Sequence, residues 1–358
     1  MKIDRIEVIQ IETPRYYGQI SGHVLIKVHV DDGPIGLGEA SDSRCADVPA
    51  LARQLNEQLK GRDARRIVEI NDFARARSWN STVSDPHVAS AVDLALYDLN
   101  GKVQGVPVYQ MLGGKVRDTL YCCYPIFGFQ VLEDFERAGS YLQRLVDLGH
   151  HLFRYYVSGD VDLDDRFLTE MKSRHGDLIR LKSIDFSRRF SDWVEALRYG
   201  DRLRRHDPYH FEQPTYDMRS SAQFAKRVDL PVTWHIGSLQ QAWEAAESGA
   251  CTAFNVACVS GGPTHVKRIL AVGEAAGLPC LIGTDQESTL GMSAQIAVGI
   301  TSPQVRLPCD PMGPLLYMAS PARERVRAEG SYLTPLEGSG LGVELDEDKL
   351  AELTVARA

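Results

Sequence analysis

The sequence predicts an α/β protein in which an α+β segment precedes a β/α barrel. Polar residues close successive apolar runs: Asp185 follows LKSI, Glu212 follows DPYHF and His235 follows PVTW. The spacings of 27 and 23 residues match one strand, one helix and two loops of a β/α unit. In addition, the pattern changes near Leu120 from a strand block and a helix block to alternating strands and helices.

The segment before Leu120 is predicted to be α+β. KIDRIEVIQIET and VLIKVHV alternate apolar and polar residues, and DDGPIGLGEA supplies a turn followed by a glycine-rich strand. Residues 48–104 favour helices, the clearest being HVASAVDLALYDLNGKVQG, which ends at Gly105. A block of strands followed by a block of helices is typical of α+β domains.

Beyond Leu120, short apolar runs alternate with amphipathic segments. Strands are predicted at 121–127, 151–157, 178–185, 209–212, 230–235, 252–257 and 279–284. The helices between them include 135–149, 191–205, 239–249 and 264–277. This order fits a β/α barrel whose last unit is incomplete or irregular. Polar residues at the ends of parallel strands would then face one pocket.

Composition is that of a soluble globular enzyme with about two domains. The 358 residues carry a net charge of −8, which argues against nucleic-acid or anionic-membrane partners. No apolar run approaches the ~20 residues of a membrane span, and MKIDRIEVIQ lacks the apolar core of a signal peptide. Seven cysteines without a CxxC motif indicate reduced thiols in a cytoplasmic protein.

Three segments together resemble the enolase superfamily, in its mandelate racemase and muconate lactonizing enzyme branch. They are DDGPIGLGEA, ALYDLNGKVQGVPVYQMLGGKVRD and GLGVELDED, and the resemblance covers nearly the whole chain. It implies a modified TIM barrel, (β/α)7β, at residues 119–318 under an α+β capping domain of residues 1–118 completed by 319–358. It also implies an Mg²⁺ ion that holds a substrate carboxylate while barrel residues remove the α-proton.

The resemblance suggests a metal site. Asp185 in IDFS and Glu212 in FEQP take the places of the family's first two metal ligands, and the third place falls on His235 in TWHIGS. An imidazole there departs from the family pattern and shifts preference from Mg²⁺ toward Mn²⁺, iron or Zn²⁺. Alternatively, the carboxylates cap helices, and His235 is a hydrogen-bonded core residue or an acid.

The family's Lys-x-Lys base pair falls on Arg154 and Tyr156. Residues two apart on a strand face the same way, and a neighbouring guanidinium would favour a phenolate, whose reference pKa is about 10. These two residues are the candidate acid/base pair. Alternatively, they fill a barrel that no longer reacts, or a shift of one residue places Tyr155 and Val157 inside.

The family's second base falls on Val256, next to Asn255, and neither side chain accepts a proton at pH 7. A two-base racemase is therefore disfavoured. Reactions on one face, such as elimination of water or closure of a lactone, remain open.

Two segments supply candidate substrate contacts. In GTDQES, Asp285 and Glu287 share a side and either contact substrate or cap the next helix. ETPRYYGQISGH resembles the family's closing loop, which would bring Tyr16, Tyr17 and His23 to the substrate.

Metal-assisted removal of a proton next to a carboxylate, giving an isomerisation or an elimination, is the favoured activity. The expected partner is a small carboxylate, and the expected assembly is a homo-oligomer. The rival hypothesis is a non-catalytic descendant that binds a ligand or a partner. Loss of both lysines and one acidic ligand favours the rival, whereas retention of Asp185 and Glu212 opposes it.

Overall fold

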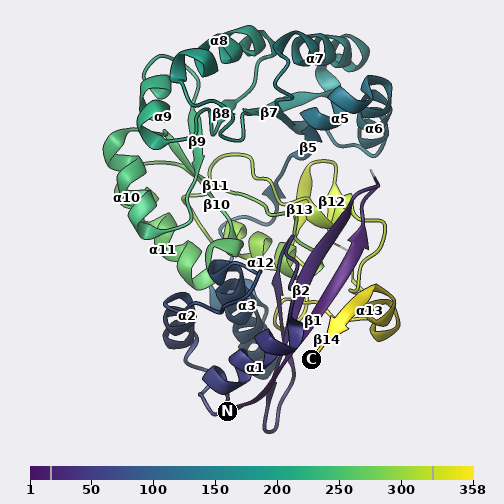
Figure 1. Cartoon of the computed structure of the whole chain (residues 1–358), viewed down its shortest axis with the longest axis vertical. Helices are drawn as coiled ribbons and strands as arrows, with labels where there is room; N and C mark the ends of the chain where they lie inside the picture. Colours follow the sequence, from purple (N-terminus) through teal and green to yellow (C-terminus); the bar gives the residue numbers. More distant parts are fainter. Residues whose placement is uncertain (17, 325) are drawn as a thin grey trace.

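The capping domain is a sheet covered by helices. The computed structural model describes residues 1–16, 18–324 and 326–358 (Figure 1). Strands β1 (Ile3–Pro14), β2 (Ile20–Val30) and β3 (Gly36–Ala40) pair antiparallel with the C-terminal β14 (Thr354–Arg357) in the order β14-β1-β2-β3. The helices α1 (Val48–Leu59), α2 (Ile67–Arg75), α3 (Asp85–Gln104) and α4 (Val108–Met111) follow.

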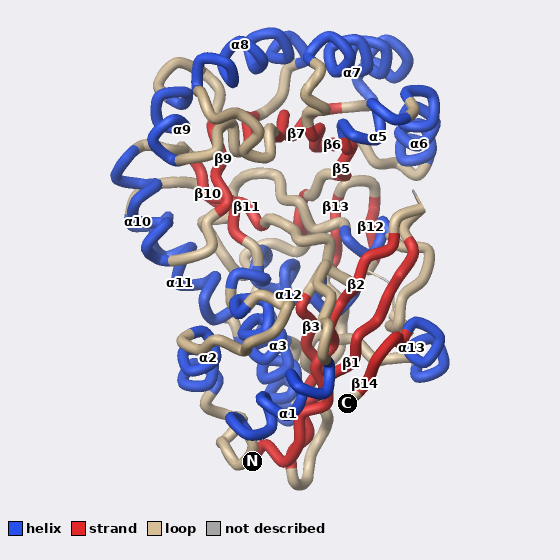
Figure 2. Tube along the Cα trace, viewed as in Figure 1, coloured by secondary structure: helices blue, strands red, loops and turns tan. Residues whose placement is uncertain are grey.

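The barrel is a curled parallel sheet inside a ring of helices (Figure 2). Its described strands run β11-β10-β9-β8-β7-β6-β5: β5 (Tyr124–Phe127), β6 (Leu152–Tyr156), β7 (Arg180–Asp185), β8 (His210–Glu212), β9 (Val232–His235), β10 (Ala253–Val256) and β11 (Cys280–Ile282). The helices are α5 (Gly128–Glu133), α6 (Phe135–Asp147), α7 (Val161–His175), α8 (Trp193–Leu203), α9 (Met218–Ala225), α10 (Leu239–Ser248), α11 (Gly262–Ala275) and α12 (Thr289–Ile300). The predicted α/β barrel is confirmed.

Irregular backbone closes the barrel between β11 and β5. Val305 bridges Cys280 of β11, and Cys309 bridges Cys122, which precedes β5. The amide of Asp310 donates to the carbonyl of Ile282 at 2.8 Å. The segment from Val305 to Asp310 therefore takes the eighth position of the barrel without forming a regular strand, as the irregular last unit predicted.

Helix α3 holds the two halves of the molecule together. It is buried on most faces because it packs against β3 on one side and α11 on the other. Glycines in GLGEA allow this approach: a Cβ on Gly36 or Gly38 would lie 2.2 or 1.9 Å from a carbonyl oxygen of α3. On the other side, the Asp93 carboxylate accepts hydrogen bonds from the amide and hydroxyl of Thr264, each at 2.9 Å.

The C-terminal tail contacts both halves. Helix α13 (Glu347–Leu353) leads into β14 of the capping sheet, whereas β12 (Arg327–Glu329) and β13 (Tyr332–Thr334) form a small sheet with β4 (Leu120–Tyr121) at the start of the barrel. The domain boundary at 118/119 stays a prediction. Among the described residues, no helix is long and apolar enough to span a membrane.

Gly38→Ala should destabilise the protein by about 1–3 kcal/mol, because the new methyl group meets the backbone of α3 rather than a movable side chain. Gly139→Ala is the matched control. Its methyl group would meet only the flexible end of Met171 at 3.4 Å, and alanine favours the helix by about 0.5–1 kcal/mol. Urea unfolding of both variants measures the difference. Equal stability of the two variants would contradict the packing role of Gly38.

Candidate functional site

The carboxyl ends of β6, β7 and β8 bring three predicted residues together. Tyr156 pairs with Asp185 across β6 and β7, and Asp185 pairs with Glu212 across β7 and β8. Arg154, two residues before Tyr156, points into the barrel with it. By contrast, Tyr155 points outward, where its hydroxyl donates to Asp164 on α7 at 2.8 Å. The register that places Arg154 and Tyr156 inside is therefore the one adopted.

Two buried cations lie among the carboxylates of the strand ends. Nη1 of Arg154 lies 3.2 Å from Glu212, 3.2 Å from Asp310 and 3.8 Å from Asp185. Nζ of Lys182 lies 2.5 Å from Asp310 and 3.2 Å from Glu212. These five side chains, Arg154, Lys182, Asp185, Glu212 and Asp310, are called the barrel charge cluster below.

Sequence reasoning missed Lys182 and Asp310. In LKSID, alternation along β7 places Lys182 on the same side as Ile184 and on the side opposite to Asp185. A shift in the β6–β7 register between Phe153 and Arg154 accompanies its inward position. Asp310 follows no strand pattern, since it lies in the irregular closing segment.

The barrel charge cluster has three acidic and two basic members, so one negative charge is left uncompensated. Burial alone would raise the pKa of Glu212, but Lys182 and Arg154 lower it well below its usual value. Burial and the charge of Glu212 raise the pKa of Asp185 to about 7. Asp185 therefore takes up a proton near neutral pH, which removes the surplus negative charge.

His235 is bonded to Glu212 at the solvent-exposed edge of the barrel charge cluster. Its Nε2 lies 2.7 Å from Oε1 of Glu212, and 36% of its side chain is accessible. Asn255 on β10 donates from Nδ2 to the same oxygen at 2.8 Å and to Asp310 at 3.2 Å. Glu212 thus fixes an imidazole at the edge of the solvent. The reading of His235 as an enclosed core residue does not fit this exposure.

Tyr156 is held as a neutral phenol. Its ring lies under the guanidinium of Arg154, 4.5 Å from ring centroid to Cζ. Burial raises the pKa of the phenol well above 10, and the three carboxylates add to the rise, so the opposing charge of Arg154 is outweighed. This direction of the pKa shift disfavours a phenolate at Tyr156, and its role as the base stays a prediction. The neutral phenol of Tyr156 can still donate a hydrogen bond.

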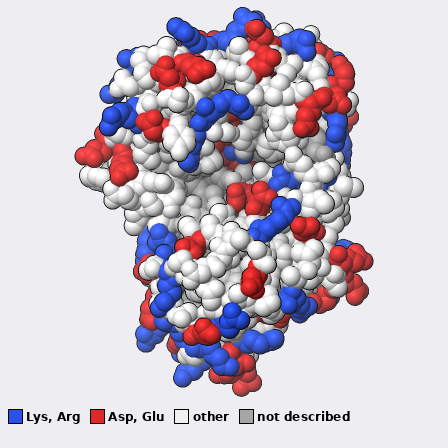
Figure 3. Space-filling view, in the orientation of Figure 1, with Lys and Arg blue, Asp and Glu red and all other residues white. Residues whose placement is uncertain are grey.

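A pocket of about 280 Å³ opens beside His235. Its walls include Arg188, His235, Asn255, Thr284 and Asp285, which come from the ends of β7 and β9 to β11. Figure 3 shows the molecule hollowed between the barrel and the capping domain, with charged side chains of both signs at the rim. This barrel-mouth pocket is the place where the site residues meet solvent.

Arg188 is a second residue that sequence reasoning missed. Its backbone, with those of Ser187 and Gln213, is left-handed, with φ of 57°, 50° and 44°. Such strain in residues other than glycine gathers at functional sites. The guanidinium lies 5.6 Å from the Trp234 ring, and with the Gln213 amide turned so that its oxygen faces Arg188, it donates to that oxygen at 2.9 and 3.0 Å. Arg188 is therefore held in one orientation at the pocket wall.

The residues of GTDQES have different environments. Asp285 lines the pocket and accepts a hydrogen bond from Nε2 of His87, at the start of α3, at 2.8 Å. Glu287 is buried at 1% exposure and bonds Thr284, the Asp285 amide and Gln295. This environment does not favour the expected contact of Glu287 with substrate, which stays a prediction. Glu287 is a structural brace of the loop before α12.

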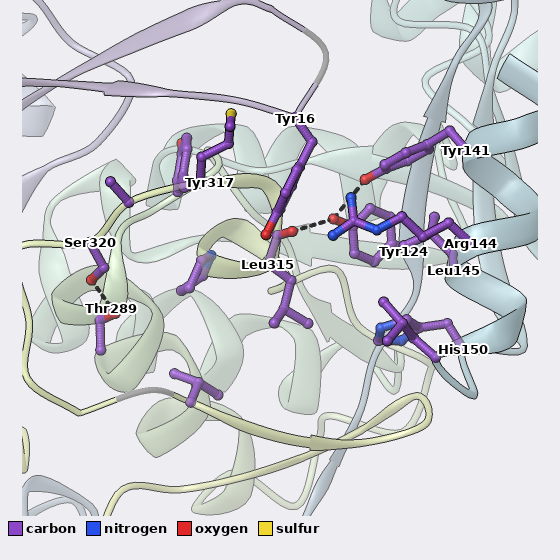
Figure 4. A pocket seen from close by; sticks show the side chains of 15 residues that line it. Tyr16, Tyr124, Tyr141, Arg144, Leu145, His150, Thr289, Leu315, Tyr317 and Ser320 are labelled. Carbon is purple, nitrogen blue, oxygen red and sulfur yellow. Dashed lines mark hydrogen bonds between the residues drawn. The ribbon is translucent and has the colours of Figure 1, made fainter. Parts of the chain in front are cut away.

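None of the described residues of the predicted closing loop, 12–23, lines the barrel-mouth pocket. His23 has 0% exposure and lies between Glu39, 2.8 Å away, and the Tyr317 ring. This environment does not favour its expected substrate contact, which stays a prediction. Tyr16 packs under Arg144 of α6 and lines a separate pocket, shown in Figure 4. Tyr17 lies outside the described residues.

A capped β/α barrel with carboxylates at consecutive strand ends defines a class of barrel enzymes, and comparison gives the family. The family model "Mandelate racemase / muconate lactonizing enzyme, N-terminal domain" matches residues 15–113, and "Enolase C-terminal domain-like" matches residues 137–349. The chain belongs to the mandelate racemase and muconate lactonizing enzyme family of the enolase superfamily.

Similar proteins are isomerases by name. The chain is 24% identical to the N-succinyl-L-Arg/Lys racemase of Bacillus cereus, over 99% of this chain and 98% of that protein. It is 25% identical to the D-galactarolactone cycloisomerase of Agrobacterium fabrum, over 92% and 90%. The crystal structure of muconate cycloisomerase from Pseudomonas fluorescens matches with a TM-score of 0.87 and 25% identity, over 99% of both chains.

Lys182→Met should cost about 3–5 kcal/mol of stability, because it leaves Glu212 and Asp310 buried with one cation fewer. Adding Asp310→Asn should return part of this loss, since the two side chains are directly coupled. Lys60→Met is the control: its ion pair with Asp4 is exposed and should change stability little. Chemical unfolding measures all three. A small loss in Lys182→Met would show that the barrel charge cluster does not need Lys182.

Proposed function

We propose that this protein removes the proton α to a carboxylate of a small acidic substrate and returns it elsewhere on the same face, giving an isomerisation. The observation that carries the proposal is the hydrogen-bonded pair of Glu212 and His235 at the edge of the barrel-mouth pocket. Similarity to cycloisomerases and a racemase supports the reaction class.

His235 is the proposed acid/base residue. Its Nε2 donates to Glu212, which leaves Nδ1 as the nitrogen that accepts a proton. A carboxylate behind an imidazole fixes the tautomer and stabilises the imidazolium once the proton has moved. Arg154 and Lys182 keep Glu212 ionised for this task. Tyr156, a neutral phenol, is proposed as a hydrogen-bond donor, with Arg154 as its positioning neighbour.

Asp185 and Glu212 are the proposed ligands of a divalent ion, with Mg²⁺ the favoured metal. The residues fit such an ion, because the barrel charge cluster has one more acidic than basic member, and a bound cation would favour the ionised form of Asp185, whose pKa burial and Glu212 raise to about 7. Two carboxylates, water and a substrate oxygen are a usual Mg²⁺ environment. When bound, the ion would stabilise the negative charge that develops on the substrate carboxylate.

Glu212 must exchange one of its present hydrogen bonds to join such a site. Among the described residues, no group of three or more His, Cys, Asp or Glu side chains is already arranged around a metal position. His235 is assigned to acid/base chemistry here, rather than to the third ligand place. Were His235 a ligand, Mn²⁺ or Zn²⁺ would be preferred over Mg²⁺.

Arg188 is the proposed anchor for an acidic group of the substrate. It lies on the pocket wall with His235, and stacking on Trp234 and bonding to Gln213 hold its guanidinium in place. A preorganised guanidinium loses little entropy when it binds a carboxylate. The place of the family's second base on β10, beside His235, holds Asn255 and Val256, which offer no proton acceptor, and this disfavours a two-base racemisation.

A non-catalytic binding protein is the second candidate. The observation that favours it is that Lys182, Arg154, Ser183, Asn255 and His235 already surround both oxygens of Glu212. Metal binding and proton exchange separate the two candidates.

Saturating Mg²⁺ should raise the melting temperature, since an ion held only by the native state stabilises it by about 2.7 kcal/mol at a hundredfold excess over Kd. Differential scanning calorimetry with EDTA, Mg²⁺, Mn²⁺ and Zn²⁺ gives the comparison. Asp185→Asn should remove the gain, whereas His235→Asn should leave it. No gain with any of the three metals would favour the binding protein. A Zn²⁺ gain that requires His235 would return His235 to the ligand set.

Wild-type protein in D₂O should place deuterium at the α-carbon of a small dicarboxylate with retained configuration. His235→Asn should slow this exchange by about 10²–10⁴-fold, because the proton acceptor is lost. Arg188→Met should chiefly raise KM, since the side chain binds the substrate without accepting the proton. Nuclear magnetic resonance follows the label.

Tyr156→Phe is the decisive control for the exchange. If only Tyr156→Phe stops exchange, the base lies on β6 rather than β9. Racemised product from the wild-type protein would mean that a second base faces the pocket. Unchanged kinetics in Arg188→Met would remove it from substrate binding.

A further inference from the structure

A second pocket lies on the outer side of the barrel, where the sheet closes. It has a volume of about 160 Å³ and lies between α6, the segment 313–320 and Tyr16 near the end of β1 (Figure 4). It shares no lining residue with the barrel-mouth pocket. We propose that this seam pocket binds a small flat carboxylate that also carries a hydroxyl group.

Arg144 supplies the charge for the carboxylate. Its guanidinium lies 4.0 Å from the centre of the Tyr16 ring, on the pocket wall. In the described part of the chain it has no Asp or Glu within ion-pair distance, unlike Arg174, Arg202 and Arg268 of the barrel helices. Figure 4 shows it beside Tyr124 and Tyr141. A stacked guanidinium without an acidic partner is suited to a carboxylate from solution.

The tyrosines beside Arg144 add no competing charge. The hydroxyl of Tyr141 donates to that of Tyr124 at 2.8 Å, and Tyr124 donates to the carbonyl of Leu315 at 2.7 Å (Figure 4). Burial raises the pKa of both phenols above their ordinary value, so both stay protonated. Arg144 is therefore the charged group of this wall that an anion would meet.

His150 supplies an acceptor for the hydroxyl. The residue lines the pocket, is 6% exposed, and packs 5.3 Å from Tyr124, centroid to centroid. One ring nitrogen bonds the backbone of Gly330, while Nδ1 has no partner among the described residues. Buried polar atoms are rarely left unpaired. Burial lowers the pKa of His150, so Nδ1 is an acceptor. Because Nδ1 is fully buried, a ligand hydroxyl would reach it through a small rotation of the ring.

The remaining walls favour a flat, apolar body. The Tyr16 and Tyr124 rings and the side chains of Leu145, Leu315 and Val326 line the space between Arg144 and His150. Aromatic and aliphatic walls with a few polar groups at their edges are typical of small-molecule sites. A hydroxyl-substituted aromatic or unsaturated acid combines the three required features.

Isothermal titration calorimetry with 3- and 4-hydroxybenzoate, benzoate and phenol tests the site. At least one hydroxybenzoate should bind more tightly than benzoate, and benzoate more tightly than phenol. Arg144→Met should raise Kd for the hydroxybenzoate about tenfold, the usual size of a lost charged hydrogen bond. Arg166→Met is the matched control, because Arg166 is an exposed arginine stacked on Phe135 at 4.9 Å, outside the pocket. It should leave Kd unchanged.

His150→Phe should remove the advantage of hydroxybenzoate over benzoate while benzoate still binds. Arg188→Met separates the two pockets. If it weakens binding and Arg144→Met does not, the probe sits at the barrel mouth and the proposal is overturned. Absence of binding at millimolar concentration, or an equal effect of Arg144→Met and Arg166→Met, overturns it as well. Because Arg144 is exposed, its variant should fold even if His150→Phe does not.

Discussion

The ionised state of Glu212 is the constraint on which the site depends. A carboxylate with no solvent exposure is costly unless cations and hydrogen-bond donors surround it. Lys182 and Arg154 meet that requirement from β7 and β6, and Asp310 ties both of them to the closing segment. The same charges that stabilise Glu212 hold His235 in position. Fold and site chemistry therefore share one set of contacts.

The second constraint is the close seating of the capping domain on the barrel. Glycines in β3 let α3 approach the sheet. The carboxylate of Asp93 on α3 then accepts hydrogen bonds from the amide and hydroxyl of Thr264 on α11. Glu39, the acid of the GLGEA motif, accepts from the amides of Ser288 and Gly291 at the start of α12. These contacts fix the loop that carries Asp285 at the barrel-mouth pocket, where His87 meets it.

Sequence determined the features that depend on local pattern. Strand alternation and the β/α spacing predicted the barrel strands and the clustering of Asp185 and Glu212, because parallel strands end at one rim. The same alternation placed Arg154 and Tyr156 on one face, as the structure has them. The sequence likewise showed that Asn255 and Val256 supply no acidic or basic group at the place of the family's second base. Periodicity carries this information because it reflects which side of a strand meets the interior.

Only the tertiary structure decided what depends on distance and burial. Lys182 and Asp310 are 128 residues apart, and nothing local pairs them. The neutral state of Tyr156 results from burial and three carboxylates that outweigh one guanidinium. His23 became part of a buried contact with Glu39, and the left-handed backbone at Arg188 set an orientation that no spacing shows. Electrostatic balance is a sum over the whole neighbourhood, so the fold had to be known before the roles of these residues could be assigned.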